Sequence, residues 1–168
     1  MNIIEKMKLT IKLAEEAMEN GELPISAIIF LDDEIISKAY ATEKTDKRFL
    51  VHAESKALLE ADKKCYSVKD RKRMQLFTTL EPCMMCLGAS LSFFIGEIYY
   101  ALEAPMDGAV KFAQNLLQEE CKEIPSYKLP KIEGSILREE AKELFKKYIK
   151  ENKEGTFMFS FAKSLSEL

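Results

Sequence analysis

The sequence predicts an α/β protein in which a mixed five-stranded sheet carries helices on both faces. Between residues 75 and 133, short runs rich in β-branched and aromatic residues alternate with segments whose apolar residues recur at helical spacing. Two further strand-like runs lie on either side of Asp32 and Asp33. Alternating strands and helices form right-handed crossovers with parallel pairing, whereas two runs joined by a short turn form an antiparallel hairpin.

The first half of the chain is expected to form two helices and three strands. Met7 and Ile11 belong to a series of apolar residues at helical spacing, and Gly21 followed by Pro24 ends that helix. The polar stretch "ATEKTDKR" then connects the hairpin to the second helix. In order, the expected elements are a helix over residues 3–20, strands over 25–31 and 34–40, a helix over 51–64 and a strand over 75–80.

The second half is expected to add three helices and two strands. One helix begins at Pro82, because proline suits the first helical position, where no backbone N–H is required, and it ends near Gly96. We expect one domain over residues 1–152, and an apolar extension over 153–168 that packs on this domain or on a partner chain. In order, the expected elements are a helix over 82–96, a strand over 97–102, a helix over about 109–121, a strand over 131–133 and a helix over 137–152.

The composition narrows the class of protein. A chain of 168 residues with 47% hydrophobic and 32% charged residues can bury one sizeable core and shows no sign of disorder. Its net charge of −3 gives no support to a dedicated nucleic-acid binder, although a local basic strip can suffice for such a role. No run is long enough to span a bilayer, and the charged N-terminus is no secretory signal, so we expect a cytoplasmic protein with reduced thiols.

Two of the four cysteines stand one helical turn apart in the stretch "TLEPCMMCLGAS". Cys83 and Cys86 follow Pro82 at a predicted helix start, where the helix dipole and free N–H groups favour thiolate over thiol. They are either small buried hydrophobes or thiolates that hold a metal ion. We assign the other two cysteines, Cys65 and Cys121, to packing.

The single histidine, His52, lies in "VHAE" at the predicted entry to the second helix. A lone histidine is most often a satisfied or exposed side chain, but one imidazole and two thiolates also form a zinc set that leaves a fourth position for water. Glu54 lies two residues further on, and it shares a face with His52 only if the backbone there is irregular. It is either a general acid and base beside the metal or only a favourable anion in the first helical turn.

The two motifs occur together and in the order typical of zinc deaminases, H-x-E followed by P-C-x-x-C. Here they read "HAE" over residues 52–54 and "PCMMC" over residues 82–86. Each precedes a helix, and the joint match is far more specific than either motif alone. The sequence therefore predicts that the two cysteines and the histidine hold zinc.

With these motifs the chain resembles the cytidine/deoxycytidylate deaminase superfamily, and within it the tRNA-specific adenosine deaminases and guanine deaminases. The stretches "TLEPCMMCLGA", "LPISAII" and "KIEGSILREEAKELFKKYIK" carry the likeness. The resemblance implies a three-layer α/β/α cytidine-deaminase-like fold, a homodimer and one Zn²⁺ per chain. It also implies that His52, Cys83 and Cys86 are the metal ligands. By the same resemblance Glu54 is the catalytic proton shuttle in the hydrolytic removal of an exocyclic amine as ammonia.

The chain departs from that family where relatives contact the substrate. Ala41 stands eleven residues before the histidine, where relatives usually carry an asparagine that hydrogen-bonds the base. Phe49 lies in an apolar approach to the histidine that usually reads Asp-Pro-Ser/Thr-Ala. Loss of a buried hydrogen-bonding amide changes discrimination by orders of magnitude. The candidate substrate-binding residues are Ala41, Phe49, Glu81 and Ala53, the last through its backbone N–H.

Three functions stay open from the sequence. An adenosine-type base presented by a tRNA anticodon loop fits the overall likeness and the basic stretch "KKCYSVKDRKR". A free base, nucleoside or other amino-heterocycle such as guanine or cytosine fits the acidic net charge and Ala41. A non-catalytic zinc scaffold is the third function, but it has no need of Glu54.

Overall fold

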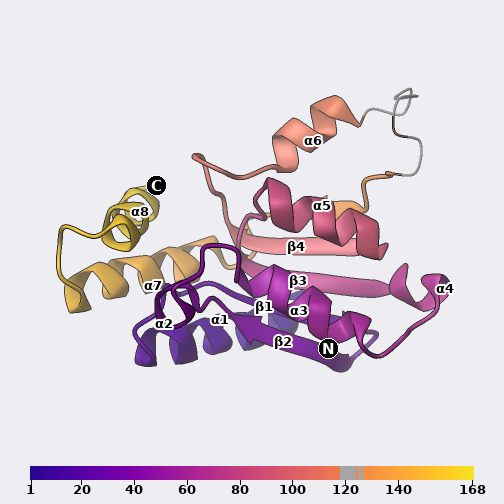
Figure 1. Cartoon of the computed structure of the whole chain (residues 1–168), viewed down its shortest axis with the longest axis horizontal. Coiled ribbons are helices and arrows are strands. Elements are labelled where there is room, and N and C mark those ends of the chain that lie inside the picture. Colours follow the sequence, from indigo (N-terminus) through magenta and orange to yellow (C-terminus); the bar gives the residue numbers. More distant parts are fainter. Residues whose placement is uncertain (118–123, 125–126) are drawn as a thin grey trace.

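The centre of the protein is a five-stranded sheet with the strand order β2-β1-β3-β4-β5 (Figure 1). The structure is a computed structural model and describes residues 1–117, 124 and 127–168. Strand β1 pairs antiparallel with β2 and β3, whereas β3, β4 and β5 run parallel to one another. The predicted mixed sheet is therefore confirmed. The strands are β1 (Ser26–Leu31), β2 (Glu34–Tyr40), β3 (Met74–Leu80), β4 (Glu97–Leu102) and β5 (Lys131–Glu133).

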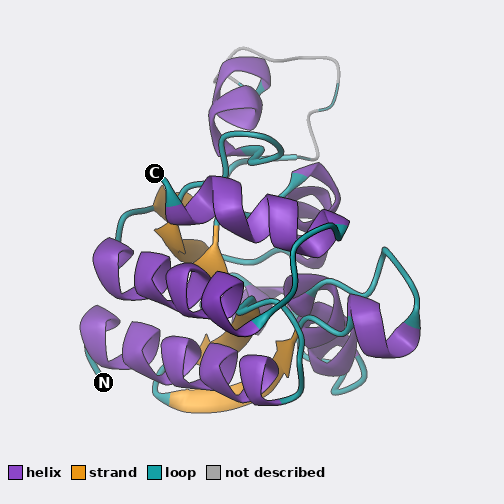
Figure 2. Ribbon diagram, turned by 90° about the vertical axis from the view of Figure 1, so that its left-hand side faces the viewer, coloured by secondary structure: helices purple, strands orange, loops and turns teal. Residues whose placement is uncertain are grey.

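Helices cover both faces of this sheet and give the predicted three layers (Figure 2). Helix α1 (Ile3–Glu19) packs on β1 and β3 and against α7 (Arg138–Glu151), which packs on β4. Helix α3 (Ala53–Asp62) packs on β1 and β2 and against α5 (Met84–Phe93). Within the ranges that the structure describes, no helix is both long and apolar enough to cross a bilayer.

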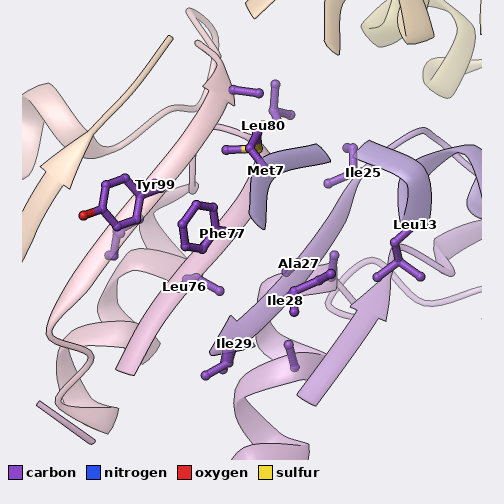
Figure 3. Packing of buried hydrophobic residues seen from close by; sticks show 14 of the residues in the cluster. Met7, Leu13, Ile25, Ala27, Ile28, Ile29, Leu76, Phe77, Leu80 and Tyr99 are labelled. Carbon is purple, nitrogen blue, oxygen red and sulfur yellow. The ribbon is translucent and has the colours of Figure 1, made fainter. Parts of the chain in front are cut away.

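Aromatic rings from adjacent strands form the middle of the core. The ring of Phe77 on β3 stacks on the ring of Tyr99 on β4 with a centroid separation of 4.7 Å (Figure 3). Phe30 on β1 meets the same Phe77 ring edge-on at 5.4 Å. Phe77 is fully buried. Its ring therefore joins the antiparallel and the parallel parts of the sheet.

The bounds of two helices differ most from the expectation. Cys83 is the N-cap of α5 and has extended backbone angles (φ −70°, ψ 172°), so the predicted start at Pro82 is wrong. The chain stays extended because Glu81 N–H donates to Leu102 O at 2.8 Å and Ala109 N–H donates to Pro82 O at 3.0 Å. Helix α6 (Val110–Leu116) is shorter than predicted, since Leu117 has left helical geometry (φ −99°, ψ 44°). The rest of the predicted helix, residues 118–121 with Cys121, lies outside the described residues.

Three helices form where none was predicted. The short helices α2 (Glu43–Asp46) and α4 (Val68–Arg71) lie in stretches that read as polar connections. The C-terminal helix α8 (Phe157–Ser166) packs on α7. Cys65, which we assigned to packing, is instead exposed at a residue with φ 52°, because the chain turns there out of α3 toward α4.

Replacing Phe77 by alanine should lower the free energy of unfolding of the zinc-loaded protein by about 3–5 kcal/mol, because removal of the ring leaves an empty cavity in the core between β1, β3 and β4. Urea denaturation followed by circular dichroism measures this change. The matched control is Leu59→Ala on α3, where 66% of the residue is exposed and the expected change is about 0.5 kcal/mol or less. Equal effects of the two substitutions would contradict the assigned core.

Candidate metal centre and active site

Two helix entries place the predicted ligand residues beside one another. His52 is the N-cap of α3 and has extended backbone angles (φ −62°, ψ 151°), so the irregular backbone required by the H-x-E motif is present. Glu54 lies in the first turn of α3. Cys83 and Cys86 occupy the N-cap and the first turn of α5, the helix that packs against α3. Residues from two distant parts of the chain therefore meet at the adjacent N-termini of two helices.

The donor atoms of the three residues lie within 4.8 Å of one another. The Nδ1 atom of His52 is 3.6 Å from the Sγ atoms of both Cys83 and Cys86. One imidazole nitrogen and two sulfurs form a donor set that suits zinc. Three such ligands are the number found where a zinc ion keeps its fourth position for a water or substrate. The residues present therefore fit the metal that the sequence motifs indicate.

The electrostatics of this cluster favour a bound cation. A hydrogen bond from Cys86 lowers the pKa of the Cys83 thiol, which favours the thiolate, and the same hydrogen bond together with burial raises the pKa of Cys86. The hydrogen bond with Cys83 raises the pKa of His52 to about 9. The thiolate character of Cys83 suits a divalent ion, and binding of that ion releases protons from the other ligands, because metal binding and deprotonation are linked.

Glu54 is the buried carboxyl group next to the cluster. Only 3% of the residue is exposed, and its Oε2 atom is 3.6 Å from the Sγ atom of Cys86. Burial raises the pKa of Glu54 to about 7. A carboxyl group with a pKa near neutrality can both accept and donate a proton. Such a group suits the role of a general acid and base better than the role of a purely structural anion at a helix entry.

A cavity of about 250 Å³ opens onto these residues. Its volume lies at the small end for small-molecule sites, and its walls combine carboxyl groups with apolar side chains. Helix α8 supplies part of the wall, so the C-terminal segment borders the candidate site. The cavity is lined by Leu23, Ile25, Glu43, Phe49, His52, Glu54, Leu80, Glu81, Cys83, Asp107, Phe157, Met158 and Phe161.

The predicted substrate-binding residues fall in different places. Phe49 lines the cavity and is 75% exposed. Glu81 also lines it, but its two oxygens accept hydrogen bonds from the backbone N–H groups of Ala104 at 3.1 Å and Val110 at 3.0 Å. Ala41 and Ala53 have no exposed surface, and neither borders the cavity among the residues that the structure describes. The Glu81 carboxylate is therefore used to hold the loop after β4.

Sequence reasoning missed several side chains of the cavity. Glu43 lies in a stretch that read as a polar connection, and nothing in its local pattern distinguishes it from the neighbouring charged residues. Burial raises the pKa of Glu43 above its ordinary value. Phe157 and Phe161 of α8 are four residues apart and their rings stack at 6.2 Å. That spacing is a helical signal, and it could have identified α8 and its apolar face.

The fold and this site together define a zinc-dependent deaminase. The chain belongs to the cytidine and deoxycytidylate deaminase family, because the family model for the cytidine and deoxycytidylate deaminase zinc-binding region matches residues 2–102. The tRNA-specific adenosine deaminase of Bacillus subtilis (strain 168) is 36% identical over 116 residues, which are 68% of this chain and 70% of that protein. The tRNA-specific adenosine deaminase of Aquifex aeolicus (strain VF5) is 34% identical over 113 residues, 67% of this chain and 74% of that protein.

Solved structures share the fold. One comes from a study of A-to-I editing by tRNA:A34 deaminases at the wobble position of transfer RNA, with a TM-score of 0.69 and 26% identity. The matched region covers 82% of this chain and 96% of the chain in that structure. A guanine deaminase from Nitrosomonas europaea has a TM-score of 0.68 at 19% identity and covers 88% of this chain and 84% of its own. At that identity the second likeness concerns the fold alone.

Serine in place of either Cys83 or Cys86 should reduce bound zinc from one ion per chain to well below half, because a hydroxyl is a poor substitute for a thiolate ligand. Metal analysis of purified protein after dialysis measures the content. Cys65→Ser is the matched control, since Cys65 is exposed and lies outside the cluster, and it should retain one zinc per chain. Full zinc content in both site variants would contradict the assigned cluster.

Proposed function

We propose that His52, Cys83 and Cys86 hold the zinc ion of this deaminase and that Glu54 carries protons during the reaction. Zinc, when bound, supplies the Lewis acidity that lowers the pKa of a coordinated water to about 7. The observation that carries the proposal is a buried carboxyl group 3.6 Å from one cysteine of a three-donor cluster, at the wall of a cavity. A scaffold that only needs zinc for stability has no use for this group.

Glu54 has three tasks in the proposed reaction. It accepts a proton from the water that attacks the amine-bearing ring carbon, and it donates that proton to the adjacent ring nitrogen. When the carbon–nitrogen bond breaks, Glu54 carries the remaining proton of the added hydroxyl to the leaving amine, which departs as ammonia while the oxygen becomes the oxo group. Water and an amino-heterocycle are thereby converted into an oxo-heterocycle and ammonia. Burial of Glu54 keeps bulk water from competing for these protons.

The first candidate substrate is an adenosine in tRNA. It rests on the two bacterial relatives named as tRNA-specific adenosine deaminases, which this chain matches over two thirds of its length. Under this reading the anticodon loop presents one base to the cavity, and Phe49, three residues before His52, is exposed enough to stack on it.

The second candidate substrate is a free base or another small amino-heterocycle. Two observations favour it, the small volume of the cavity and the apolar side chains with which α8 closes one side. Residues 153–168 then form an extension that limits access to a deaminase domain over residues 1–152. We place this activity in the cytoplasm, where the cysteine ligands stay reduced.

Ammonia release from a panel of bases, nucleosides and tRNA anticodon stem-loops tests the activity. The wild-type protein should release ammonia from at least one member. Glu54→Gln should keep one zinc per chain but lose at least about a thousandfold in kcat, because the amide cannot carry protons. Absence of turnover with zinc bound would support the scaffold instead, and an active Glu54→Gln variant would refute the proposed shuttle.

We further propose a homodimer that uses the exposed apolar groove between α5 and α6. Met84 on α5 and Phe112 and Leu116 on α6 are each more than half exposed and line this groove. Exposed apolar patches of this kind are typical of protein interfaces.

Phe112→Lys should convert the dimer into a monomer, because it places a charge in the proposed apolar interface. Size-exclusion chromatography with light scattering measures the mass. Leu59→Lys is the matched control, since Leu59 is even more exposed than Phe112 but lies on α3 outside the groove, and this variant should remain dimeric. A monomeric wild-type protein, or two dimeric variants, would contradict this interface.

A further inference from the structure

Glu43 is a carboxylate of the cavity wall that the reaction described above does not use. It begins the one-turn helix α2 and lines the same cavity as His52 and Glu54. Only 10% of its side chain is exposed. Its Oε2 atom is buried and has no hydrogen-bond partner among the residues that the structure describes. A buried polar atom without a partner is costly and rare, so its retention calls for an explanation.

The surrounding contacts hold this carboxylate in place. Glu22, itself almost fully buried, accepts hydrogen bonds from the backbone N–H groups of Lys44 at 3.1 Å and Thr45 at 2.6 Å. The Nζ atom of Lys56 donates to Thr42 Oγ1 at 2.8 Å, just before the helix. These bonds fix α2 by its backbone and by the residue that precedes it. The Glu43 side chain is therefore set at the cavity wall by a rigid support.

His52 does not satisfy this carboxylate. The Oε1 atom of Glu43 is 3.9 Å from the Nε2 atom of His52, which is longer than a hydrogen bond. The other ring nitrogen of His52, Nδ1, faces the two cysteines. Because Oε2 is buried, Oε1 is the oxygen of Glu43 whose acceptor capacity a molecule in the cavity could use.

The charge of the cavity limits what that molecule can be. Four carboxyl groups line the cavity, and no lysine or arginine lines it among the described residues. Such a wall repels phosphate and favours neutral or cationic ligands. The four carboxyl groups belong to Glu43, Glu54, Glu81 and Asp107.

We propose that Glu43 binds the substrate directly and selects an amino-heterocycle that carries a ring N–H in addition to the amine that is removed. This inference rests on the proposed deaminase function and specifies its substrate class. Adenine or cytosine joined to ribose, as in RNA, offers only acceptors on its ring, which a carboxylate repels, whereas guanine keeps its N1–H. A free base keeps a ring N–H, and a hydrogen bond from this group to a carboxylate is charge-assisted.

The test uses three free bases and their ring-N-methylated forms: adenine with 9-methyladenine, cytosine with 1-methylcytosine and guanine with 1,9-dimethylguanine. Calorimetry on zinc-loaded Glu54→Gln protein measures each Kd without turnover. At least one unmethylated base should bind about 10- to 100-fold more tightly than its methylated form, as expected for a hydrogen bond to a charged group. In the Glu43→Gln, Glu54→Gln double variant this preference should fall below about threefold. Glu43→Asp in place of Glu43→Gln keeps the negative charge, whereas the amide of Gln keeps only a neutral acceptor, so Glu43→Asp should retain part of the preference.

The matched control is Asp46→Asn, which removes an exposed carboxylate from the same short helix, where it accepts a hydrogen bond from Thr42. It should keep the full preference. A preference that persists in the Glu43→Gln variant would mean that the methyl group is excluded by shape, and it would overturn the inference. Absence of binding or of any preference in the parent protein would do the same. A loss of zinc in the Glu43→Gln variant would assign Glu43 to positioning His52 instead.

Failure of the inference is distinguishable from failure of the proposed function. If wild-type protein releases ammonia from a base but the Glu43→Gln variant keeps the donor preference, only the role of Glu43 is wrong. If wild-type protein releases ammonia from no member of the wider panel, the proposed function itself is wrong.

Discussion

The site depends on one constraint, the meeting of two helix N-termini whose N-cap residues both remain extended. His52 and Cys83 occupy these N-cap positions, and Cys86 follows one turn into α5. The positive ends of both helix dipoles and their free N–H groups stabilise negative charge at this point. The site therefore stabilises the Cys83 thiolate before any metal binds. If either helix began two residues earlier, one of these side chains would turn away from the others.

The sheet supplies the fixed distance between those helices. Helix α3 follows the β1–β2 hairpin and α5 follows β3, which is the neighbour of β1. The rings of Phe77 and Tyr99 join β3 to β4, and the loop after β4 is held by the carboxylate of Glu81. The same core that stabilises the protein thus sets the separation of His52 from the two cysteines and the position of the cavity wall.

Local sequence patterns predicted the bounds of those helices and strands that depend on neighbouring residues alone. Strand β4 has the predicted bounds, and α1 differs by one residue, because apolar periodicity and turn residues specify both. The start of α5 was wrong because its delay depends on hydrogen bonds to β4 and the loop that follows it, which are distant in sequence. Likewise the approach of Glu43 to His52 and of α8 to the cavity depends on tertiary contacts. The grouping of His52, Cys83 and Cys86 was predictable since their spacing is itself the signal, whereas the other side chains of the cavity have no such spacing.

The relatives and the cavity favour different substrates. Sequence identity to the tRNA-specific adenosine deaminases of Bacillus subtilis and Aquifex aeolicus favours a base in RNA. The carboxylates of the cavity, the apolar face of α8 and the alanine at position 41 favour a small free heterocycle. The proposed chemistry is compatible with either substrate, since the donor cluster and most of the cavity wall lie on different segments.

The central claim is a zinc ion with one imidazole and two thiolate ligands and a fourth position open to water. X-ray absorption spectroscopy at the zinc edge of the purified protein tests it most directly. The account predicts two sulfurs at about 2.3 Å and two nitrogen or oxygen neighbours at about 2.0–2.1 Å, one of which is exchanged by an added small anion. Three or four sulfur neighbours, or a shell that no added ligand changes, would show a closed structural site and contradict the account.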